Sequence, residues 1–273
     1  MGLSKTRQAI VAGQFYPASA ADIKKVINGF LDSKSSKVNA IACMLPHAGY
    51  KYSGKVAAQT LAGINIRDKV ILLGPNHTGF GEAYSIMAEG SWVTPLGQVN
   101  IDAQLAKNIL GSCGYLKNDF LAHAQEHSLE VQLPLLQYFK KSFEIVPIAF
   151  MSDDLTVLKK IGEDISRVIK KNSLEDKVLL LASSDMTHYE PQEKAETKDK
   201  IAIDAILELD PDKLLEVIGQ YNISMCGYAP VIVMLSAARA LGAKTARLAN
   251  YQTSSEATGD RSSVVGYAGI ILE

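Results

Sequence analysis

Cysteine is scarce in this chain of 273 residues, and its three cysteines lie far apart in the sequence. Cys43, Cys113 and Cys226 form neither a CxxC pair nor the even set that a disulfide framework needs. We therefore expect reduced thiols in a cytoplasmic protein, so each cysteine has to be judged by its own neighbours.

An excess of either charge is also missing, because 28 basic residues stand against 29 acidic ones and the net charge is −1. Such a balance supplies no broad basic field, so nucleic acid is not an expected partner. Long apolar runs are absent too, and stretches such as 178–182 fall far short of the roughly 20 residues that cross a bilayer. The start, MGLSKTRQAIVAGQFYP, lacks the apolar core of a signal peptide. We expect no membrane partner.

The chain does contain enough apolar material for a sizeable core, with 47% hydrophobic and 21% charged residues. No internal repeat, low-complexity segment or linker-like change in composition divides it. A single domain over residues 1–273 is therefore expected, and this length is ordinary for an α/β domain.

Short, nearly continuous apolar runs alternate with segments of helical periodicity. The runs are typical of strands buried on both faces, and the predicted strands are Ala40–Leu45, Lys69–Leu73, Glu144–Phe150, Lys177–Ala182, Thr245–Gln252 and Ser263–Leu272. The predicted helices are Ala20–Leu31, Lys55–Ala62, Ala103–Leu110, Leu129–Phe139, Leu155–Lys171, Glu193–Leu209, Lys213–Tyr221 and Pro230–Leu241. This alternation predicts an α/β fold with a mainly parallel sheet covered on both sides. The last two strands form either an antiparallel pair or a longer excursion.

Histidines follow three of the predicted strands. His47 comes after the first strand, His77 after the second, and Asp185 and His188 after the strand Lys177–Ala182. Ligands of open α/β sheets bind beyond the carboxyl ends of the strands, where these side chains are expected to meet. A hydrogen-bonded histidine near a turn is the simpler interpretation of any one of them, but it explains three together less well.

Neutral imidazole is the commonest metal ligand, and two strand-end histidines can fill two positions of a mononuclear site. The third ligand is normally a carboxylate or a thiolate. Cys226 lies just before the predicted helix Pro230–Leu241, whose positive end can lower the pKa of a thiol. The alternative is that Cys226 is a small buried hydrophobe.

A second motif offers a competing interpretation. His123, Glu126 and His127 form HAQEH, a literal match to the H-x-x-E-H pattern of zinc peptidases, which needs both imidazoles on one helix face. Pro134 follows soon afterwards and is expected to bend or cap the helix. The sequence therefore gives weak support to the long helix that such a peptidase uses.

Taken together, the motifs resemble those of one family. VAGQFYP, LPHAGYKYSG, LLGPNHTGFG, TPLGQV, EHSLEVQLPLL, SSDMTH, MCGYAP and YQTSSEATGDRSSVVGYAG occur in the order seen in Memo-like proteins, also called AmmeMemoRadiSam system protein B. The resemblance covers nearly the whole chain. It implies a three-layer α/β/α sandwich around a mainly parallel or mixed sheet, shared with class III extradiol ring-cleaving dioxygenases of the LigB type.

The resemblance also implies roles for individual residues. The dioxygenases hold Fe(II) with two histidines and a glutamate, and His47 and His77 match the two histidine ligands. Cys226 takes the place of the glutamate, His188 matches the acid/base histidine, and His127 matches a second pocket histidine. Asp185 is expected to orient the ring of His188. Because thiolate is softer than carboxylate, the site favours copper, zinc or a differently tuned iron.

Three functions remain open. The first is a metal-dependent redox enzyme, dioxygenase-like, in which iron or copper, with zinc as a further candidate, is held by His47, His77 and Cys226. The second is a module that binds a peptide or small-molecule ligand without catalysis, as the phosphopeptide recognition and cell motility associated with animal Memo-like proteins suggest. The third uses Cys226 as a nucleophile activated by His188 and Asp185. The family name implies radical-SAM and AMMECR1-like pathway partners.

Overall fold

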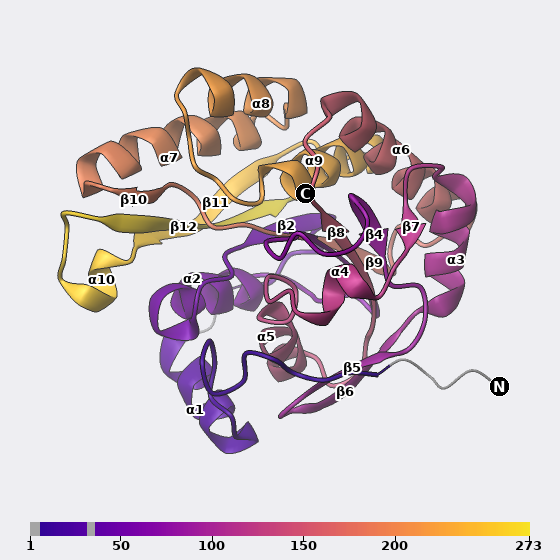
Figure 1. Cartoon of the computed structure of the whole chain (residues 1–273), viewed down its shortest axis with the longest axis horizontal. Coiled ribbons are helices and arrows are strands. Elements are labelled where there is room, and N and C mark those ends of the chain that lie inside the picture. The colour runs from indigo at the N-terminus through magenta and orange to yellow at the C-terminus, as the bar shows by residue number, and fades with distance from the viewer. Residues whose placement is uncertain (1–5, 32–35) are drawn as a thin grey trace.

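A mixed β-sheet runs through the protein, whose computed structural model describes residues 6–31 and 36–273 (Figure 1). In these residues 12 strands join one sheet. They are β1 (Thr6–Arg7), β2 (Ala42–Leu45), β3 (Lys69–Pro75), β4 (Tyr84–Ile86), β5 (Ser91–Thr94), β6 (Gly97–Ile101), β7 (Lys117–Asn118), β8 (Glu144–Phe150), β9 (Val178–Ser183), β10 (His188–Glu190), β11 (Ala246–Thr253) and β12 (Val264–Leu272).

The centre of the sheet is parallel and its margins are not. Strands β8, β3, β9 and β2 lie side by side in that order and run parallel. On one side β12 pairs antiparallel with β2 and β11. On the other side β4 pairs antiparallel with β8, and β6 runs parallel to it. The carboxyl ends of four neighbouring strands therefore share one edge.

Helices cover both faces of the sheet, which makes three layers (Figure 1). One layer holds α3 (Ala103–Ser112), α6 (Leu155–Lys171), α7 (Gln192–Leu207), α8 (Pro211–Gln220) and α9 (Tyr228–Leu241). The opposite layer holds α1 (Ala20–Phe30), α2 (Tyr50–Ala62) and α5 (Gln132–Phe139). Two short helices, α4 (Leu121–Ala124) and α10 (Ser255–Thr258), lie in connections. The predicted α/β sandwich is confirmed, and the sheet is mixed.

The predicted strands all occur, and the last two form the antiparallel pair β11–β12. Every residue of β2 and β9 is buried, as the unbroken apolar runs predict. The same prediction is wrong for β11, in which Arg247 and Leu248 are exposed, because within the described residues no helix or strand covers it as closely as the central strands are covered. Helix α5 begins at Gln132 instead of Leu129, so that Pro134 lies in its first turn, where its missing N–H costs nothing. Helix α6 has the predicted bounds.

Helix α2 begins at Tyr50, five residues before the predicted start at Lys55. Gly54, a poor helix former, obscured this start in the sequence. Packing favours a glycine here, because a Cβ would lie 2.6 Å from Cε2 of Phe30 in α1 and the Phe30 ring would have to move. With this earlier start, α2 begins only three residues after His47.

The hairpin β5–β6 and the short strands β1, β4, β7 and β10 were not predicted. Each has at most five residues and several are polar, so none produces a clear period-two pattern. No helix within residues 6–31 and 36–273 is long and apolar enough to span a membrane.

Candidate metal centre

Three neighbouring strands deliver side chains to the same edge of the sheet. His47 lies two residues after β2, His77 two residues after β3, and Asp185 two residues after β9. Because these strands are parallel and adjacent, their carboxyl ends bring the two imidazoles together, with 5.3 Å between the ring centroids. The predicted convergence of His47 and His77 is thus observed.

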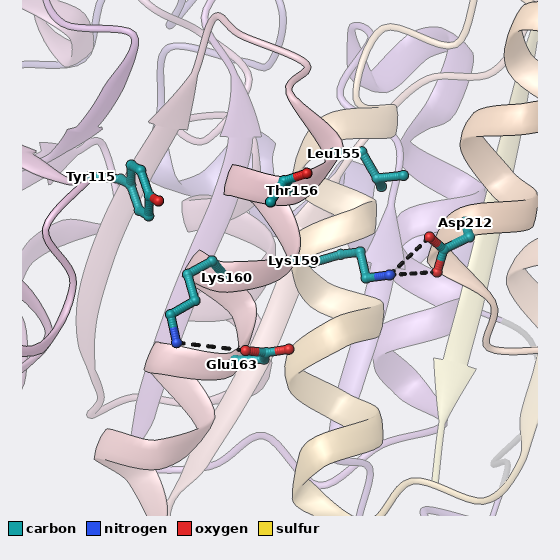
Figure 2. Close-up of a pocket in the computed structure, with 7 residues that line it drawn as sticks. All are labelled: Tyr115, Leu155, Thr156, Lys159, Lys160, Glu163 and Asp212. Atoms are coloured by element: carbon teal, nitrogen blue, oxygen red, sulfur yellow. Dashed lines mark hydrogen bonds and ion pairs between the residues drawn. The ribbon is translucent and has the colours of Figure 1, made fainter.

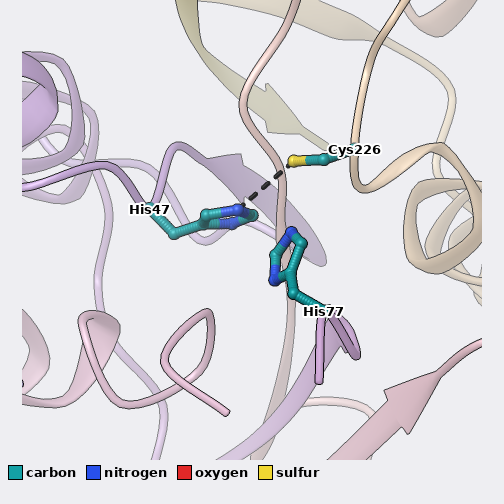
Figure 3. A group of neighbouring side chains, drawn as sticks. All are labelled: His47, His77 and Cys226. Carbon is teal, nitrogen blue, oxygen red and sulfur yellow. Dashed lines mark hydrogen bonds between the residues drawn. The ribbon is translucent and has the colours of Figure 1, made fainter. Parts of the chain in front are cut away.

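Cys226 reaches the same point from a different part of the chain (Figure 3). It lies two residues before α9, and its Sγ is 3.2 Å from Nε2 of His47. This approach requires Gly227, because a Cβ at that position would lie 2.4 Å from the carbonyl oxygen of Ser183 at the end of β9. One ligand atom from each of His47, His77 and Cys226 lies within 4.8 Å of the others.

The remaining predicted site residues gather around this group. The ring of His127, from the turn between α4 and α5, stacks on His77 at 4.9 Å and lies 5.5 Å from His47. His127, Asp185 and His188 line a cavity of about 520 Å³ together with His47 and His77. We call it the histidine cavity; its other lining residues are Phe15, Ala48, Gly49, Tyr52, Tyr189, Ser254, Thr258, Ser263, Val265 and Tyr267.

Hydrogen bonds behind His47 select its tautomer. Gln132 donates from Nε2 to the carbonyl of Pro46, which can only accept, and to Oγ of Ser183 at 2.8 Å. Ser183 Oγ donates its own proton to the carbonyl of Ser128 at 2.8 Å. It can therefore only accept from Nδ1 of His47, 3.0 Å away. The proton of His47 sits on Nδ1, so Nε2 presents a lone pair toward Cys226.

Glu126 performs the same task for His77. Its Oε1 lies 3.0 Å from Nδ1 of His77, and its Oε2 accepts from the backbone N–H of the same residue. These contacts and the N–H of Ser128 lower the pKa of this buried carboxyl to about 2 despite the opposing effect of burial. The carboxylate therefore accepts from Nδ1 and leaves Nε2 of His77 free for a metal, as carboxylate–histidine pairs do in metal sites.

The turn that carries Glu126 and His127 is anchored from the N-terminal segment. Arg7 in β1 donates to the carbonyl of Glu126 at 2.6 Å and forms an ion pair of 2.6 Å with Glu130. Both side chains of the pair are almost fully buried, and Tyr16 donates its hydroxyl to the same carboxylate. Breaking a buried pair of this kind typically costs about 3–5 kcal/mol, so the turn is held firmly.

Two imidazoles of the site, those of His47 and His127, are kept uncharged. Burial lowers the pKa of His47 well below its usual value, and the nearby His77 and His127 lower it further. Burial also lowers the pKa of His127, although Glu126 opposes that shift. Because a histidine must be unprotonated to ligate a metal, this environment favours metal binding at neutral pH.

The thiol of Cys226 departs from the expectation. Burial raises its pKa, and the carboxylate of Asp185 raises it further, whereas the position ahead of α9 was expected to lower it. Without a metal, the thiol is thus protonated at neutral pH and donates to Nε2 of His47. This environment disfavours the nucleophilic cysteine hypothesis, which needs a thiolate.

Asp185 and His188 are close but do not form the predicted orienting pair. Oδ1 of Asp185 accepts from the backbone N–H of His47 at 2.8 Å, so the carboxylate fixes the loop after β2. Nδ1 of His188 instead donates to the carbonyl of Ser224 at 2.9 Å. The Ser224 carbonyl therefore sets the tautomer of His188, and Nε2 is left as its proton-accepting atom.

The zinc-peptidase interpretation of HAQEH fails on geometry. Helix α4 ends at Ala124, so His123 and His127 do not share a helix face. His123 is fully buried against Trp92, 6.0 Å away between ring centroids, and does not line the histidine cavity. Glu126 was overlooked as a site residue because this motif suggested another role for it.

A second donor set consists of His77, Glu126 and His127, whose ligand atoms also lie within 4.8 Å of one another. Two histidines and one carboxylate can hold Fe(II). Here, however, Glu126 already accepts from His77, and both of its oxygens are hydrogen-bonded. In the set formed by His47, His77 and Cys226, the outer partners hold both rings through Nδ1, and the thiol contacts Nε2 of His47 at 3.2 Å, so this set is the better candidate.

A different kind of pocket lies beside α6 and shares no lining residue with the histidine cavity (Figure 2). In it Lys159 pairs with Asp212 at 2.7 Å and Lys160 with Glu163 at 3.7 Å. Since its charged side chains neutralise each other, this α6 pocket presents no unpaired donor set.

Comparison with known proteins gives a consistent result. The sequence matches the family described as "Memo-like protein" over residues 7–271. It is 42% identical to a MEMO1 family protein of Methanopyrus kandleri, with 97% of this chain and 98% of the relative covered. It is 41% identical to one from Methanocaldococcus jannaschii, covering 99% and 100%, and 42% identical to one from Aquifex aeolicus, covering 98% and 99%.

Proposed function

The chain belongs to the Memo-like protein family, and on this premise we propose that it is a metal-dependent redox enzyme whose iron or copper ion is held by His47, His77 and Cys226. A bound ion of either element would supply one-electron chemistry and Lewis acidity at the wall of the histidine cavity. The substrate is proposed to be a small molecule that enters this cavity.

The observation that carries the proposal is the direction of the hydrogen bonds. Ser183 accepts from His47 and Glu126 accepts from His77, so each ring keeps its Nε2 lone pair for a ligand. The third donor, Cys226, already contacts one of these nitrogen atoms at 3.2 Å. Two imidazoles and one thiolate are a set that suits copper, zinc or iron. Such an outer shell is typical of metal sites and is unnecessary for histidines that only pack.

Hydrogen bonds and pKa shifts indicate roles for three other residues that line the cavity. His188 donates from Nδ1 to Ser224, so its Nε2 can take a proton from a ligand in the cavity or return it. His127 contacts the rings of Phe15, 4.8 Å away, and of His77, and its lowered pKa makes it a hydrogen-bonding partner that stays uncharged. Asp185 holds the backbone of His47 in place and is a positioning residue.

Anaerobic expression with supplied iron or copper, followed by elemental analysis, tests the proposal. The wild type should retain close to one ion per chain and consume oxygen when a reductant is present. His47→Ala should lose both properties, while Lys159→Ala, in the α6 pocket, should keep both. Wild-type protein that holds no ion above the level of His47→Ala would refute the proposal.

A second candidate function is supported by the shape of the histidine cavity. Its wall includes the aromatic rings of Phe15, Tyr52 and Tyr267, and Tyr189 stands 77% exposed at its rim. Aromatic walls of this kind can hold a peptide or organic ligand without chemistry. A phosphopeptide titration with and without a chelator separates the two functions: affinity that survives chelation favours a binding module.

Pathway association with radical-SAM and AMMECR1-like proteins stays a prediction.

A further inference from the structure

The candidate metal centre forms a wall between two cavities. His47 and His127 line the histidine cavity, whose lining does not include Cys226. Cys226 lines a second cavity of about 370 Å³, and His77 lines both. We call the second one the cysteine cleft; its other lining residues are Pro75, Asn76, Phe150, Met151, Ser152, Asp153, Tyr228, Ala229 and Pro230.

The cysteine cleft runs from the surface to the sulfur. Met151 is 36% exposed and Asp153 is also exposed, so both lie near its mouth, whereas Cys226 is only partly exposed. Its walls come from the ends of β3 and β8 and from the first turn of α9. The sulfur of Cys226 is therefore approached from a different side than the one on which a ligand of the histidine cavity would lie.

The residues along the cleft suit a metal ion. The mouth offers the carboxylate of Asp153, held by the Tyr228 hydroxyl at 2.8 Å, and the thioether of Met151. The inner end offers the imidazole of His77 and the thiol of Cys226. No lysine or arginine is among the lining residues, and Asp153 opposes the partial positive charge at the amino end of α9. The mouth thus offers one hard donor, a carboxylate, and one soft donor, a thioether, and the inner end offers an imidazole and a thiol.

We propose that the cysteine cleft is the entrance through which a transition-metal ion reaches His47, His77 and Cys226, separate from the histidine cavity that takes the organic ligand. This inference rests on the proposed metal-binding function for the identity of what enters. The route itself, from Met151 to Cys226, is a property of the folded chain and can be tested without a metal.

The route is tested by alkylating metal-free protein with iodoacetamide, a small neutral reagent. Cys43 and Cys113 are buried, at 0% and 1% exposure, so peptide mapping should find the modification at Cys226. Met151→Trp, which narrows the mouth of the cleft, should slow the reaction several-fold. Ser263→Trp, at the exposed rim of the histidine cavity, is the matched control and should leave the rate unchanged. Slowing by Ser263→Trp alone, or by neither variant, would overturn the proposed route.

Entry of a metal ion through the cysteine cleft is tested by mixing metal-free protein with Co²⁺ and following the thiolate-to-cobalt absorption with time. Met151→Trp should load several-fold more slowly than the wild type while reaching the same final absorption, and Ser263→Trp should load normally. Asp153→Asn should slow cobalt loading, most at low ionic strength, without changing iodoacetamide alkylation. Equal loading by wild type, Met151→Trp and Asp153→Asn would overturn the metal-entrance role. Absence of any cobalt signal in the wild type would instead refute the proposed function, with the alkylation result still reporting on the route.

Discussion

The histidine cavity and the α6 pocket both gather ionisable side chains, yet they arrange them in opposite ways. In the α6 pocket the Nζ of Lys159 lies 2.7 Å from a carboxylate oxygen of Asp212, and the two side chains are 37% and 55% exposed. Around the candidate metal centre, in contrast, Glu126 is 1% exposed and points its oxygens at the back of His77. The paired charges of the α6 pocket have no free group to bind a ligand. The buried carboxylate of Glu126, in contrast, binds Nδ1 of His77 and leaves the Nε2 lone pair of that ring for a ligand.

The difference teaches that the direction of a hydrogen bond distinguishes a site from a cluster. Proximity alone would rank the Lys159–Asp212 pair beside the contact between Cys226 and His47. Only the second has an outer layer, formed by Gln132 and Ser183, that fixes where the ring proton lies. The following variants are chosen to break that layer or to show that the α6 pocket has no counterpart to it.

Removal of a proposed ligand should have the largest effect. Cys226→Ser and His77→Ala should each weaken metal binding by well over about 100-fold, which is more than loss of an outer-shell partner typically costs. Competition titration against a chelator of known affinity measures this change. Lys159→Ala is the control and should bind as the wild type does; a similar loss in the control would remove the contrast between the two pockets.

Removal of the carboxylate behind His77 should have the next largest effect. Glu126→Gln should weaken metal binding by about 10–100-fold, because the amide no longer raises the basicity of the ring or fixes its tautomer as firmly. The same titration measures it, and circular dichroism checks that the variant is folded. Wild-type affinity in a folded Glu126→Gln protein would show that the outer layer has no influence on the metal.

A change of one pH unit should alter metal affinity less than the loss of a ligand does, and the affinity should rise with pH. Burial and Asp185 raise the pKa of the Cys226 thiol, so metal binding must release that proton across the neutral range. Affinity should therefore rise by about tenfold per pH unit, as expected for one displaced proton. The lowered pKa of His47 and of His127 means that these rings add little to the slope. Cys226→Ser should flatten the profile, and an unchanged slope would argue that the thiol is not a ligand.

The smallest effect is expected in the α6 pocket. Lys159→Ala should change the free energy of unfolding by less than about 1 kcal/mol, because exposed ion pairs contribute little and are screened by salt. Urea titration at low and high ionic strength measures it. A destabilisation that is several times larger would mean that Lys159 has a structural role beyond its pair with Asp212.

Much of the fold could be predicted from the sequence, for a physical reason. Strands such as Lys69–Pro75 and Val178–Ser183 are buried on both faces and therefore appear as unbroken apolar runs. The convergence of His47 and His77 could be predicted as well, because carboxyl ends of parallel strands share an edge. The start of α2 could not, since the contact of Gly54 with Phe30 depends on packing between helices.

The residues that hold the site histidines in place could not be predicted from the sequence. Glu126 is 49 residues from its partner His77, and Ser183 is 136 residues from His47. The role of Ser224 in orienting His188 comes from a backbone carbonyl, which leaves no trace in residue identity. The raised pKa of Cys226 likewise follows from burial and from Asp185, whereas the sequence showed only a helix start nearby.

The central claim is that His47, His77 and Cys226 hold one ion. Anomalous diffraction from crystals prepared anaerobically with iron or copper tests it most directly. We predict a single anomalous peak about 2.0–2.4 Å from Nε2 of both histidines and from the sulfur of Cys226. A peak bound by Glu126 and His127 without the sulfur, or no peak at this edge of the sheet, would contradict the account.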